Sequence, residues 1–405
     1  MKTMRPIRET VPLSEALALL LEHATPIERV ERVAIADAMD RVLAEDVTSA
    51  VDVPPFDRAG MDGYAVVAED TFGAGRYEPK VLRCLETVYT GDLPSRAVTH
   101  GECIEIATGA PMPQGATAVV MVEETEKTDD PAVRIFTPVY PGQHVGRRGA
   151  DIKAGQTILR AGTVINPSRI GALAAAGVLE IDVFAKPRVA IVSTGNEIVE
   201  PGRPLKPGQI YDINKLTLSS ITNAHGGIAI NRGTAADSLA DLVAAIESMR
   251  DADVIVFSGG SSVGERDLLL DALKQAGEVL FHGIAVKPGK PTAFGRIGPA
   301  PVLGMPGYPT SCLSNGYILL VPLLRRIARL PEHRPHQVRV PLAARVVSTT
   351  GRYQFYTVRL QDGMAVPAFK ASGDITSMAH ADGYIEIPAQ TDVVEAGEIV
   401  EVKLF

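Results

Sequence analysis

Glycine and serine cluster in one segment of the chain where backbone N–H groups could hold an anion. Gly259-Gly260-Ser261-Ser262-Val263-Gly264 follows the serine Ser258 and is expected between a strand and a helix. Bare backbone donors at such a turn can approach a phosphate. The segment is not a Walker A sequence, because no Gly-Lys-Ser/Thr follows. A tight turn that uses glycine only for positive φ remains the alternative.

Two lysines stand three residues apart in Lys287-Pro288-Gly289-Lys290-Pro291. The two prolines stiffen this segment, and a phosphate pocket would gain from that rigidity. A solvated turn with ordinary surface lysines is the alternative.

A third segment, Met305-Pro306-Gly307-Tyr308-Pro309, precedes a helix predicted from about residue 310. The N-terminus of a helix offers unpaired N–H donors and a partial positive charge to an anion. A helix start defined by proline alone is the alternative.

Carboxylates recur near these loops at Glu197, Asp212, Asp237 and Asp267. Mg2+ prefers oxygen ligands and often bridges a carboxylate to substrate phosphates. Asp237 and Asp267 could instead cap the helices that begin beside them.

The N-terminal half carries three further polar loops: 57–64 (DRAGMDGY), 108–113 (TGAPMP) and 146–151 (GRRGAD). Their arginines could recognise an oxyanion, and their acids could act on a substrate. Each loop could also be a turn closed by a local ion pair.

After Pro187 the pattern predicts alternating strands and helices. Strands are expected at 188–194, 228–232, 254–260, 279–286 and 301–304, and helices at 212–224, 237–249, 267–276 and 310–328. This alternation favours a parallel sheet with helices on both faces, which makes three layers. Ligands of such folds bind beyond the carboxyl ends of the strands, where the polar motifs fall.

The rest of the chain predicts a multidomain protein of α/β and β type. Helices are expected at 13–24, capped by Ser14, at 36–44, and at 168–177, capped by Ser168. Short strands such as 64–67, 81–88, 117–122 and 133–138 indicate a β-rich insert, and the sequence after 330 indicates a small barrel-like β domain. The expected domains are a discontinuous helical N-terminal domain (1–52 and 146–186), the insert (53–145), an α/β domain (187–329) and a C-terminal domain (330–405).

Composition excludes several classes of protein. The 405 residues are 46% hydrophobic and 22% charged, with a net charge of -8, so a broad surface for nucleic acid is not expected. Three scattered cysteines suggest neither a disulfide framework nor a zinc site. The N-terminus lacks the apolar core of a signal peptide, and no run of 18 apolar residues occurs. We therefore expect a cytoplasmic protein.

Eight segments together resemble the molybdopterin molybdotransferase family, which comprises the MoeA proteins and the E domain of gephyrin. They are PPFDRAGMDGYAV (54–66), ATGAPMPQGATAVVMVEET (107–125), GRRGADI (146–152), STGNEI (193–198), GQIYDIN (208–214), SGGSSVGERD (258–267), KPGKPTAFG (287–295) and GMPGYPTS (304–311). They follow the order of the family and extend over most of the chain.

The resemblance implies a homodimer of four-domain chains that inserts molybdate into adenylyl-molybdopterin with Mg2+ and releases AMP. It also implies that the α/β domain binds the pterin and works with the insert of the other subunit. The positions tied to catalysis are Asp62, Thr108, Asp151, Glu197, Asp237 and Asp267, of which Glu197, Asp237 and Asp267 would bind Mg2+. The positions tied to substrate binding are Ser258, Gly259, Gly260, Ser261, Lys287, Lys290, Pro306, Gly307, Pro309 and Ser372.

Three residues depart from the family pattern. Tyr308 replaces a frequent Asn, Ile213 replaces a Ser or Thr, and Thr357 replaces an Arg, a loss for which Arg352 or Arg359 could compensate. Three other functions stay open: insertion of tungstate, adenylylation of the pterin, and a gephyrin-like scaffold without chemistry. Other proteins of cofactor synthesis are possible partners, whereas nucleic acid and membrane are not expected.

Overall fold

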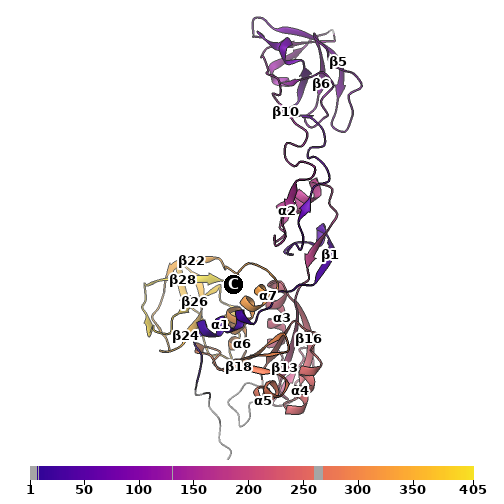
Figure 1. Cartoon of the computed structure of the whole chain (residues 1–405). Coiled ribbons are helices and arrows are strands. Elements are labelled where there is room, and N and C mark those ends of the chain that lie inside the picture. The colour runs from indigo at the N-terminus through magenta and orange to yellow at the C-terminus, as the bar shows by residue number, and fades with distance from the viewer. Residues whose placement is uncertain (1–6, 8, 130, 260–267) are drawn as a thin grey trace, which may run out of the picture. The chain divides into compact units, whose positions relative to one another are not determined.

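A computed structural model describes residues 7, 9–129, 131–259 and 268–405 (Figure 1). The chain forms two compact units, each with its own hydrophobic clusters. Unit 1 comprises Met1–Glu31, Asp40–Val42 and Phe184–Phe405, and unit 2 comprises Arg32–Met39 and Leu43–Val183.

Unit 1 contains a six-stranded sheet in the order β16-β13-β17-β21-β20-β18. The strands are β13 (Arg188–Thr194), β16 (Ile228–Ala235), β17 (Val254–Ser258), β18 (Glu278–His282), β20 (Ala293–Ile297) and β21 (Ala300–Met305). β16, β13, β17 and β21 run parallel, but β20 is antiparallel to both of its neighbours. The prediction of a wholly parallel sheet is therefore wrong at β20. There, Gly298 and Pro299 form a tight hairpin turn that places Ile297 opposite Ala300, so β20 and β21 run antiparallel.

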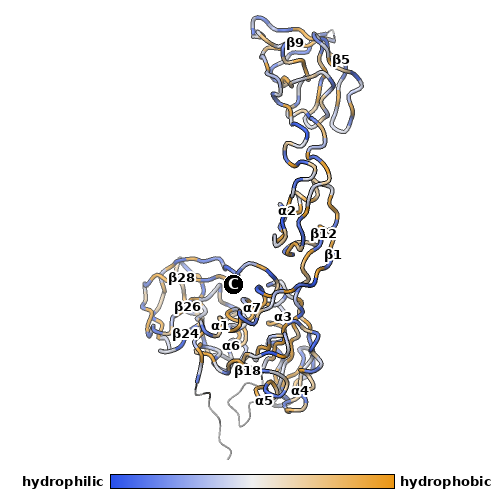
Figure 2. Tube along the Cα trace, viewed as in Figure 1, coloured by the Kyte–Doolittle hydropathy of each residue, from blue (hydrophilic) through white to orange (hydrophobic). Residues whose placement is uncertain are grey.

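Helices cover both faces of this sheet, as the alternation of apolar residues requires. Val189 and Ile191 of β13 pack on one face with α1 (Leu13–Glu22) and α3 (Asn214–Ala224). Ala190 and Val192 pack on the opposite face with α4 (Leu239–Glu247) and α5 (Leu268–Ala276). Figure 2 marks the apolar stretches of these elements in orange. The predicted three-layer α/β fold is confirmed.

Several boundaries differ from the sequence prediction. The helix expected over 310–328 is α6 (Pro309–Asn315), a π-helical turn (Gly316–Leu320) and α7 (Val321–Ile327). β18 ends at His282 because Gly283 adopts a φ of 98°. Ser238, and not Asp237, caps α4 by accepting a hydrogen bond from the Asp241 N–H.

The C-terminal part of unit 1 is a β region, as predicted. Its main sheet has the order β19-β24-β26-β28-β22, and β25 pairs with β24. The elements are β19 (Val286–Lys287), β22 (Gln337–Pro341), β23 (Val346–Val347), β24 (Tyr353–Gln361), β25 (Met364–Pro367), α8 (Thr376–Ala379), β26 (Gly383–Ile387), β27 (Val393–Val394) and β28 (Ile399–Leu404). Because β19 comes from the Lys287 segment and pairs with β24, the two parts of unit 1 are joined at the predicted lysine loop.

Unit 2 is built around a second six-stranded sheet, in the order β7-β4-β6-β5-β9-β8. The strands are β4 (Gly63–Val66), β5 (Lys80–Val88), β6 (Glu102–Ile106), β7 (Ala118–Met121), β8 (Thr125–Lys127) and β9 (Ala132–Ile135). Smaller elements are β2 (Val47–Thr48) with β11 (Thr157–Leu159), β3 (Arg58–Ala59) with β10 (Val145–Gly146), and α2 (Pro167–Ala175). β1 (Val30–Ala34) pairs with β12 (Glu180–Phe184), and most residues of both strands belong to unit 2. The predicted β-rich insert is thus present.

Three expectations for the N-terminal helices are wrong. Residues 36–44 form no α-helix: a 3-10 turn ends at Asp37, and Asp40 has a φ of 60° that interrupts any helix. Pro12, and not Ser14, precedes α1, without a side-chain cap. Asn166, and not Ser168, caps α2, with Pro167 at its first position. The four domain boundaries stay predictions. No helix among the described residues is long and apolar enough to cross a membrane.

Candidate functional site

The carboxyl ends of three neighbouring strands of unit 1 bring three polar motifs side by side. Ser193 of β13 is the register partner of Ser258 of β17, which in turn is the partner of Met305 of β21. We call this edge, with the loops that follow each strand, the strand-end site. It is where a ligand is expected in a sheet of this kind.

Two glycines allow the loops of the strand-end site to approach each other. Gly259 has a φ of 93°, and a methyl group there would lie 2.6 Å from the Thr194 carbonyl oxygen. A methyl group at Gly307 would lie 3.6 Å from Gly259 Cα. The Gly259 N–H donates to the Met305 carbonyl at 3.2 Å. The predicted ligand residues Ser258, Gly259, Pro306 and Gly307 are therefore neighbours.

A buried polar group beside these loops contains Asp212, which was named from the sequence, and Asn214 and Lys215, which were not named as site residues. Asn214 Nδ2 donates to the Gly307 carbonyl at 2.8 Å. Lys215 and Asp212 are each 3% exposed, and Lys215 Nζ lies 3.3 Å from Asp212 Oδ2 and pairs with Glu200. Burial lowers the pKa of Lys215, but its bonds to Glu200 and Asp212 outweigh burial and raise that pKa. The motif GQIYDIN contained this signal, since Asn214 and Asp212 belong to it.

Two of the three predicted metal ligands lie at the same edge. Glu197 follows β13, and its carboxylate folds over Gly195, where a methyl group would meet its oxygens at 2.7 Å. Asp237 lies two residues after Ala235, the register partner of Thr194, and its N–H approaches Asn196 Oδ1 at 3.5 Å. Both carboxylates are exposed, and neither has a hydrogen bond or ion pair with another described residue.

Exposed carboxylate oxygens without partners suit a hard divalent cation. No group of three or more His, Cys, Asp or Glu side chains that could hold a metal ion occurs within the described ranges. The third predicted ligand, Asp267, lies outside the described residues, as do Gly260 and Ser261. Glu197 and Asp237 fit Mg2+ in chemistry and place, and the complete ligand set stays a prediction.

The two predicted lysines are partly buried and each has a neighbour in the chain. Lys287 Nζ donates to Thr349 Oγ1 at 2.8 Å, and Lys290 Nζ donates to the Ile7 carbonyl at 2.8 Å. An ammonium has three donors, so each lysine keeps capacity for an anion. Between them, Gly289 adopts a φ of 114° against Asn315, whose Nδ2 donates to the Gly289 carbonyl.

The loop that carries Ser372 lies against the start of α6. The Thr310 N–H donates to the Ser372 carbonyl at 3.1 Å, and Thr310 Oγ1 donates to the Asp374 carbonyl at 3.2 Å. Because Pro309 has no N–H and that of Thr310 is used, the first turn of the helix offers fewer free donors than the sequence suggested. The structure does bring Ser372 to the Pro306–Pro309 segment.

The departures from the family pattern have local explanations in two cases. Ile213 has no side chain that can cap α3, and Asp212 Oδ1 instead accepts from the Lys215 N–H at 3.1 Å. Thr357 is fully buried in β24, so it contacts no anion from solvent. Tyr308 is 66% exposed at the strand-end site, and nothing in the structure explains the loss of Asn there.

In unit 2, the structure joins two predicted catalytic residues. The Thr108 N–H donates to Asp62 Oδ1 at 2.6 Å, and this hydrogen bond lowers the pKa of Asp62. Thr90 Oγ1 in turn donates to the Thr108 carbonyl at 2.8 Å. Asp151 is exposed, and its side chain forms no hydrogen bond or ion pair with the described part of the chain.

The arginines of the GRRGAD loop form ion pairs. Arg147 pairs with Asp57 at 2.8 Å, and Arg148 pairs with Asp52 at 2.6 Å. The Arg148 N–H also donates to Asp57, and this bond, the largest cause, lowers the pKa of Asp57. The alternative of an ion pair is thus favoured for these arginines, but the pairs join residues 90 and 96 positions apart in the sequence, so they are not local to the loop.

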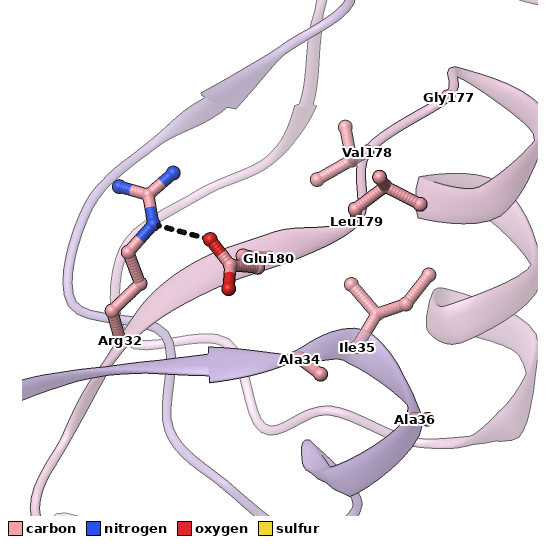
Figure 3. A pocket seen from close by; sticks show the side chains of 8 residues that line it. All are labelled: Arg32, Ala34, Ile35, Ala36, Gly177, Val178, Leu179 and Glu180. Carbon is pink, nitrogen blue, oxygen red and sulfur yellow. Dashed lines mark hydrogen bonds and ion pairs between the residues drawn. The ribbon is translucent and has the colours of Figure 1, made fainter.

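A separate hollow in unit 2 lies between β1, the 3-10 turn after it, and β12 (Figure 3). Its lining is mainly aliphatic, with one ion pair between Arg32 Nε and Glu180 Oε2 at 3.1 Å. Arg32 is the cationic residue among those that line the hollow, and it is already paired with Glu180. The strand-end site is therefore the better candidate for an anionic ligand.

The comparisons with known proteins identify the family of the chain. Residues 190–326, which include the strands of the strand-end site, match the family described as a probable molybdopterin binding domain. Residues 11–177 match the MoeA N-terminal region (domains I and II), and residues 339–405 match the MoeA C-terminal region (domain IV). The chain belongs to the MoeA family of molybdopterin molybdenumtransferases.

Curated relatives and a solved structure cover nearly the whole chain. Molybdopterin molybdenumtransferase 2 of Mycobacterium tuberculosis is 36% identical over 381 residues, which cover 91% of this chain and 94% of the relative. The molybdopterin molybdenumtransferase of Haemophilus influenzae is 31% identical, with 97% and 98% covered. The structure of the molybdopterin biosynthesis MoeA protein of Pyrococcus horikoshii superposes with a TM-score of 0.83 at 43% identity and covers 98% of this chain and 99% of that one.

Proposed function

We propose that the protein is a molybdopterin molybdenumtransferase that inserts molybdate into adenylyl-molybdopterin and releases AMP. The observation that carries the proposal is the strand-end site, where Ser258, Gly259 and Gly307 meet beside the carboxylates of Glu197 and Asp237, which have no partner among the described residues. The family to which the chain belongs supports the substrate.

In this mechanism the chain binds and orients a substrate with several negative charges. The Ser258–Gly259 and Pro306–Gly307 loops receive the pterin, and Lys287 and Lys290 neutralise its phosphates. Glu197 and Asp237, together with Asp267, would hold Mg2+, and the bound ion would offset charge on the transferring phosphoryl group. A molybdate oxygen attacks the phosphorus of the pterin phosphate, and the phosphoanhydride is cleaved with release of AMP. The Mo–O bond to that phosphate then breaks and leaves the oxygen on phosphorus, while molybdenum bonds to the two dithiolene sulfurs, whose protons leave with one oxo group as water.

The proposal includes a cytoplasmic homodimer, in keeping with the family resemblance, in which Asp62, Thr108 and Asp151 serve catalysis. It leaves tungstate as a competing substrate, because the two oxyanions are alike in size and charge.

The test is to incubate the purified protein with adenylyl-molybdopterin and Mg2+, titrate molybdate or tungstate, and measure AMP. AMP that appears only with an oxyanion supports insertion and names the preferred metal. Consumption of ATP on unadenylylated pterin would point to adenylylation instead. Tight pterin binding without AMP release would point to a scaffold.

A further inference from the structure

Two of the three cysteines, far apart in the sequence, meet in the sheet of unit 2. Cys84 of β5 and Cys103 of β6 are register partners on neighbouring parallel strands. Register partners point to the same face of a sheet, and both side chains pack in one hydrophobic cluster with Leu82 and Val133. Both thiols are free.

The spacing of the two strands is compatible with a covalent bond. Neighbouring strands lie about 4.8 Å apart, within the range of about 4.4–6.8 Å between Cα atoms that disulfides span. The β5–β6 ladder is irregular between Cys84 and Thr87, so β5 is not held to a regular pairing directly after Cys84. The two sulfurs can therefore approach each other without disrupting regular β5–β6 hydrogen bonds on both sides of Cys84.

The two sulfurs are also unequal in chemistry. Cys84 is partly exposed, whereas Cys103 is fully buried. The Cys84 Sγ donates to the Glu86 carbonyl oxygen at 3.6 Å. The neighbouring Cys103 thiol can donate to the Cys84 thiolate, and this is the largest cause that lowers the pKa of Cys84 to about 6 and raises that of Cys103. Burial is the next cause and raises the pKa of Cys84, as does the Glu105 carboxylate, which is paired with Lys127 at 3.1 Å. The Glu105 N–H and Lys127 lower it. Cys84 is thus the more nucleophilic of the pair.

We propose that Cys84 and Cys103 form a reversible dithiol–disulfide site that reacts with peroxide. The Cys84 thiolate attacks one peroxide oxygen and becomes a sulfenic acid, with hydroxide as the leaving group. The Cys103 sulfur then attacks the Cys84 sulfur, the S–O bond breaks, and water leaves. Two thiols and one hydrogen peroxide give one disulfide and two waters, and a thiol reductant restores both cysteines.

The third cysteine is an internal control. Cys312 of α6 is fully buried, and burial raises the pKa of its thiol to about 12. A buried, protonated thiol reacts slowly with peroxide, so Cys312 is expected to stay reduced under the same treatment.

The experiment treats the full-length protein with hydrogen peroxide, counts free thiols after denaturation, and maps peptides by mass spectrometry without reduction. We expect the thiol count to fall from three to one, with Cys84 linked to Cys103 in the same chain and Cys312 free. The rate should rise with pH as Cys84 deprotonates, with its midpoint below the ordinary thiol pKa of about 8.5. Retention of all three thiols, a bond between two chains, or oxidation that stops at a Cys84 acid without linkage would overturn the proposal.

Two variants separate the steps. In Cys103→Ala, Cys84 should stop at a sulfenic acid that dimedone traps, and in Cys84→Ser the fast reaction should disappear. Cys312→Ala should react like the unchanged protein. If Cys103→Ala fails to fold, the Cys84→Ser variant and the pH profile still decide the outcome. None of these readouts depends on AMP release. The outcome for the cysteine pair is therefore independent of the outcome for the proposed function.

Discussion

At the scale of single residues, Glu197 and Asp237 differ from most acids of unit 1 because they are exposed and have no partner among the described residues. We expect Glu197→Gln and Asp237→Asn each to lower molybdate-dependent AMP release about 100-fold or more, the loss typical when a group that stabilises transferring charge is removed. Because both sites are exposed, the free energy of unfolding should change by less than about 0.5 kcal/mol.

Glu247→Gln is the matched control, since Glu247 is an exposed acid of α4 that pairs with Arg250. It should leave AMP release unchanged. Full activity in both Glu197→Gln and Asp237→Asn would remove these carboxylates from the mechanism.

Lys215 offers a prediction about stability rather than chemistry. Lys215→Met leaves the Asp212 carboxylate, 3% exposed, without its buried cation, which should lower the free energy of unfolding by about 3–5 kcal/mol. Folding raises the pKa of Lys215, so its charged form stabilises the folded protein. This contribution to the free energy of unfolding is fully present below the ordinary lysine pKa of about 10.4 and is lost as the pH rises through the pKa of Lys215 in the folded protein.

Urea unfolding between pH 7 and pH 11 checks this sign. The unchanged protein should lose stability at the alkaline end, and Lys215→Met should lack that component. The double variant with Asp212→Asn should recover part of the loss at pH 7. Equal stability of Lys215→Met and the unchanged protein at pH 7 would contradict a buried ion pair.

At the scale of elements, the close approach of β4 and β7 in unit 2 depends on one glycine. A methyl group at Gly63 of β4 would lie 1.8 Å from the Val120 carbonyl oxygen of β7. Gly63→Ala should therefore destabilise unit 2 by more than the 1–3 kcal/mol (roughly) of ordinary overpacking. Gly75→Ala is the control, because nothing lies within 4 Å of a methyl group there. Thermal unfolding measures both variants, and similar midpoints would contradict the tight approach.

The elements that the sequence predicted best are those with strong apolar periodicity. The strands β13 and β17 and the helices α3 and α4 lie close to their expected ranges because each buries a continuous apolar face. The prediction of a helix at 36–44 was wrong because Asp40 has a positive φ. The spacing of apolar residues gives no sign of that backbone conformation. β20 was missed because its pairing depends on a hairpin turn rather than on periodicity.

The candidate site shows the same limit. Motif order placed Ser258, Gly307 and Glu197 correctly at the strand ends, but the contact between Asn214 and Gly307 joins residues 93 positions apart. Likewise, Cys84 and Cys103 gave no signal as separate positions. Contacts of this kind depend on how elements pack, and a single sequence carries no record of them.

At the scale of the whole molecule, the two units have separate hydrophobic clusters. The unit that binds a ligand can therefore be identified, because only that unit should gain stability against local unfolding. If adenylyl-molybdopterin binds at the strand-end site, a concentration of 100 times its Kd should stabilise unit 1 by about 2.7 kcal/mol. Amide exchange that requires unfolding of that unit should then slow about 100-fold.

Hydrogen exchange measured by mass spectrometry resolves this by peptide. Peptides from β13, β17 and β21 should gain protection when the pterin is added, because their carboxyl ends form the strand-end site. A pterin without the adenylyl group should protect the same peptides less at equal concentration, since it lacks one phosphate for Lys287 and Lys290 to neutralise. Protection confined to β4 and β6 would place the pterin in unit 2 and refute the strand-end site as its binding site.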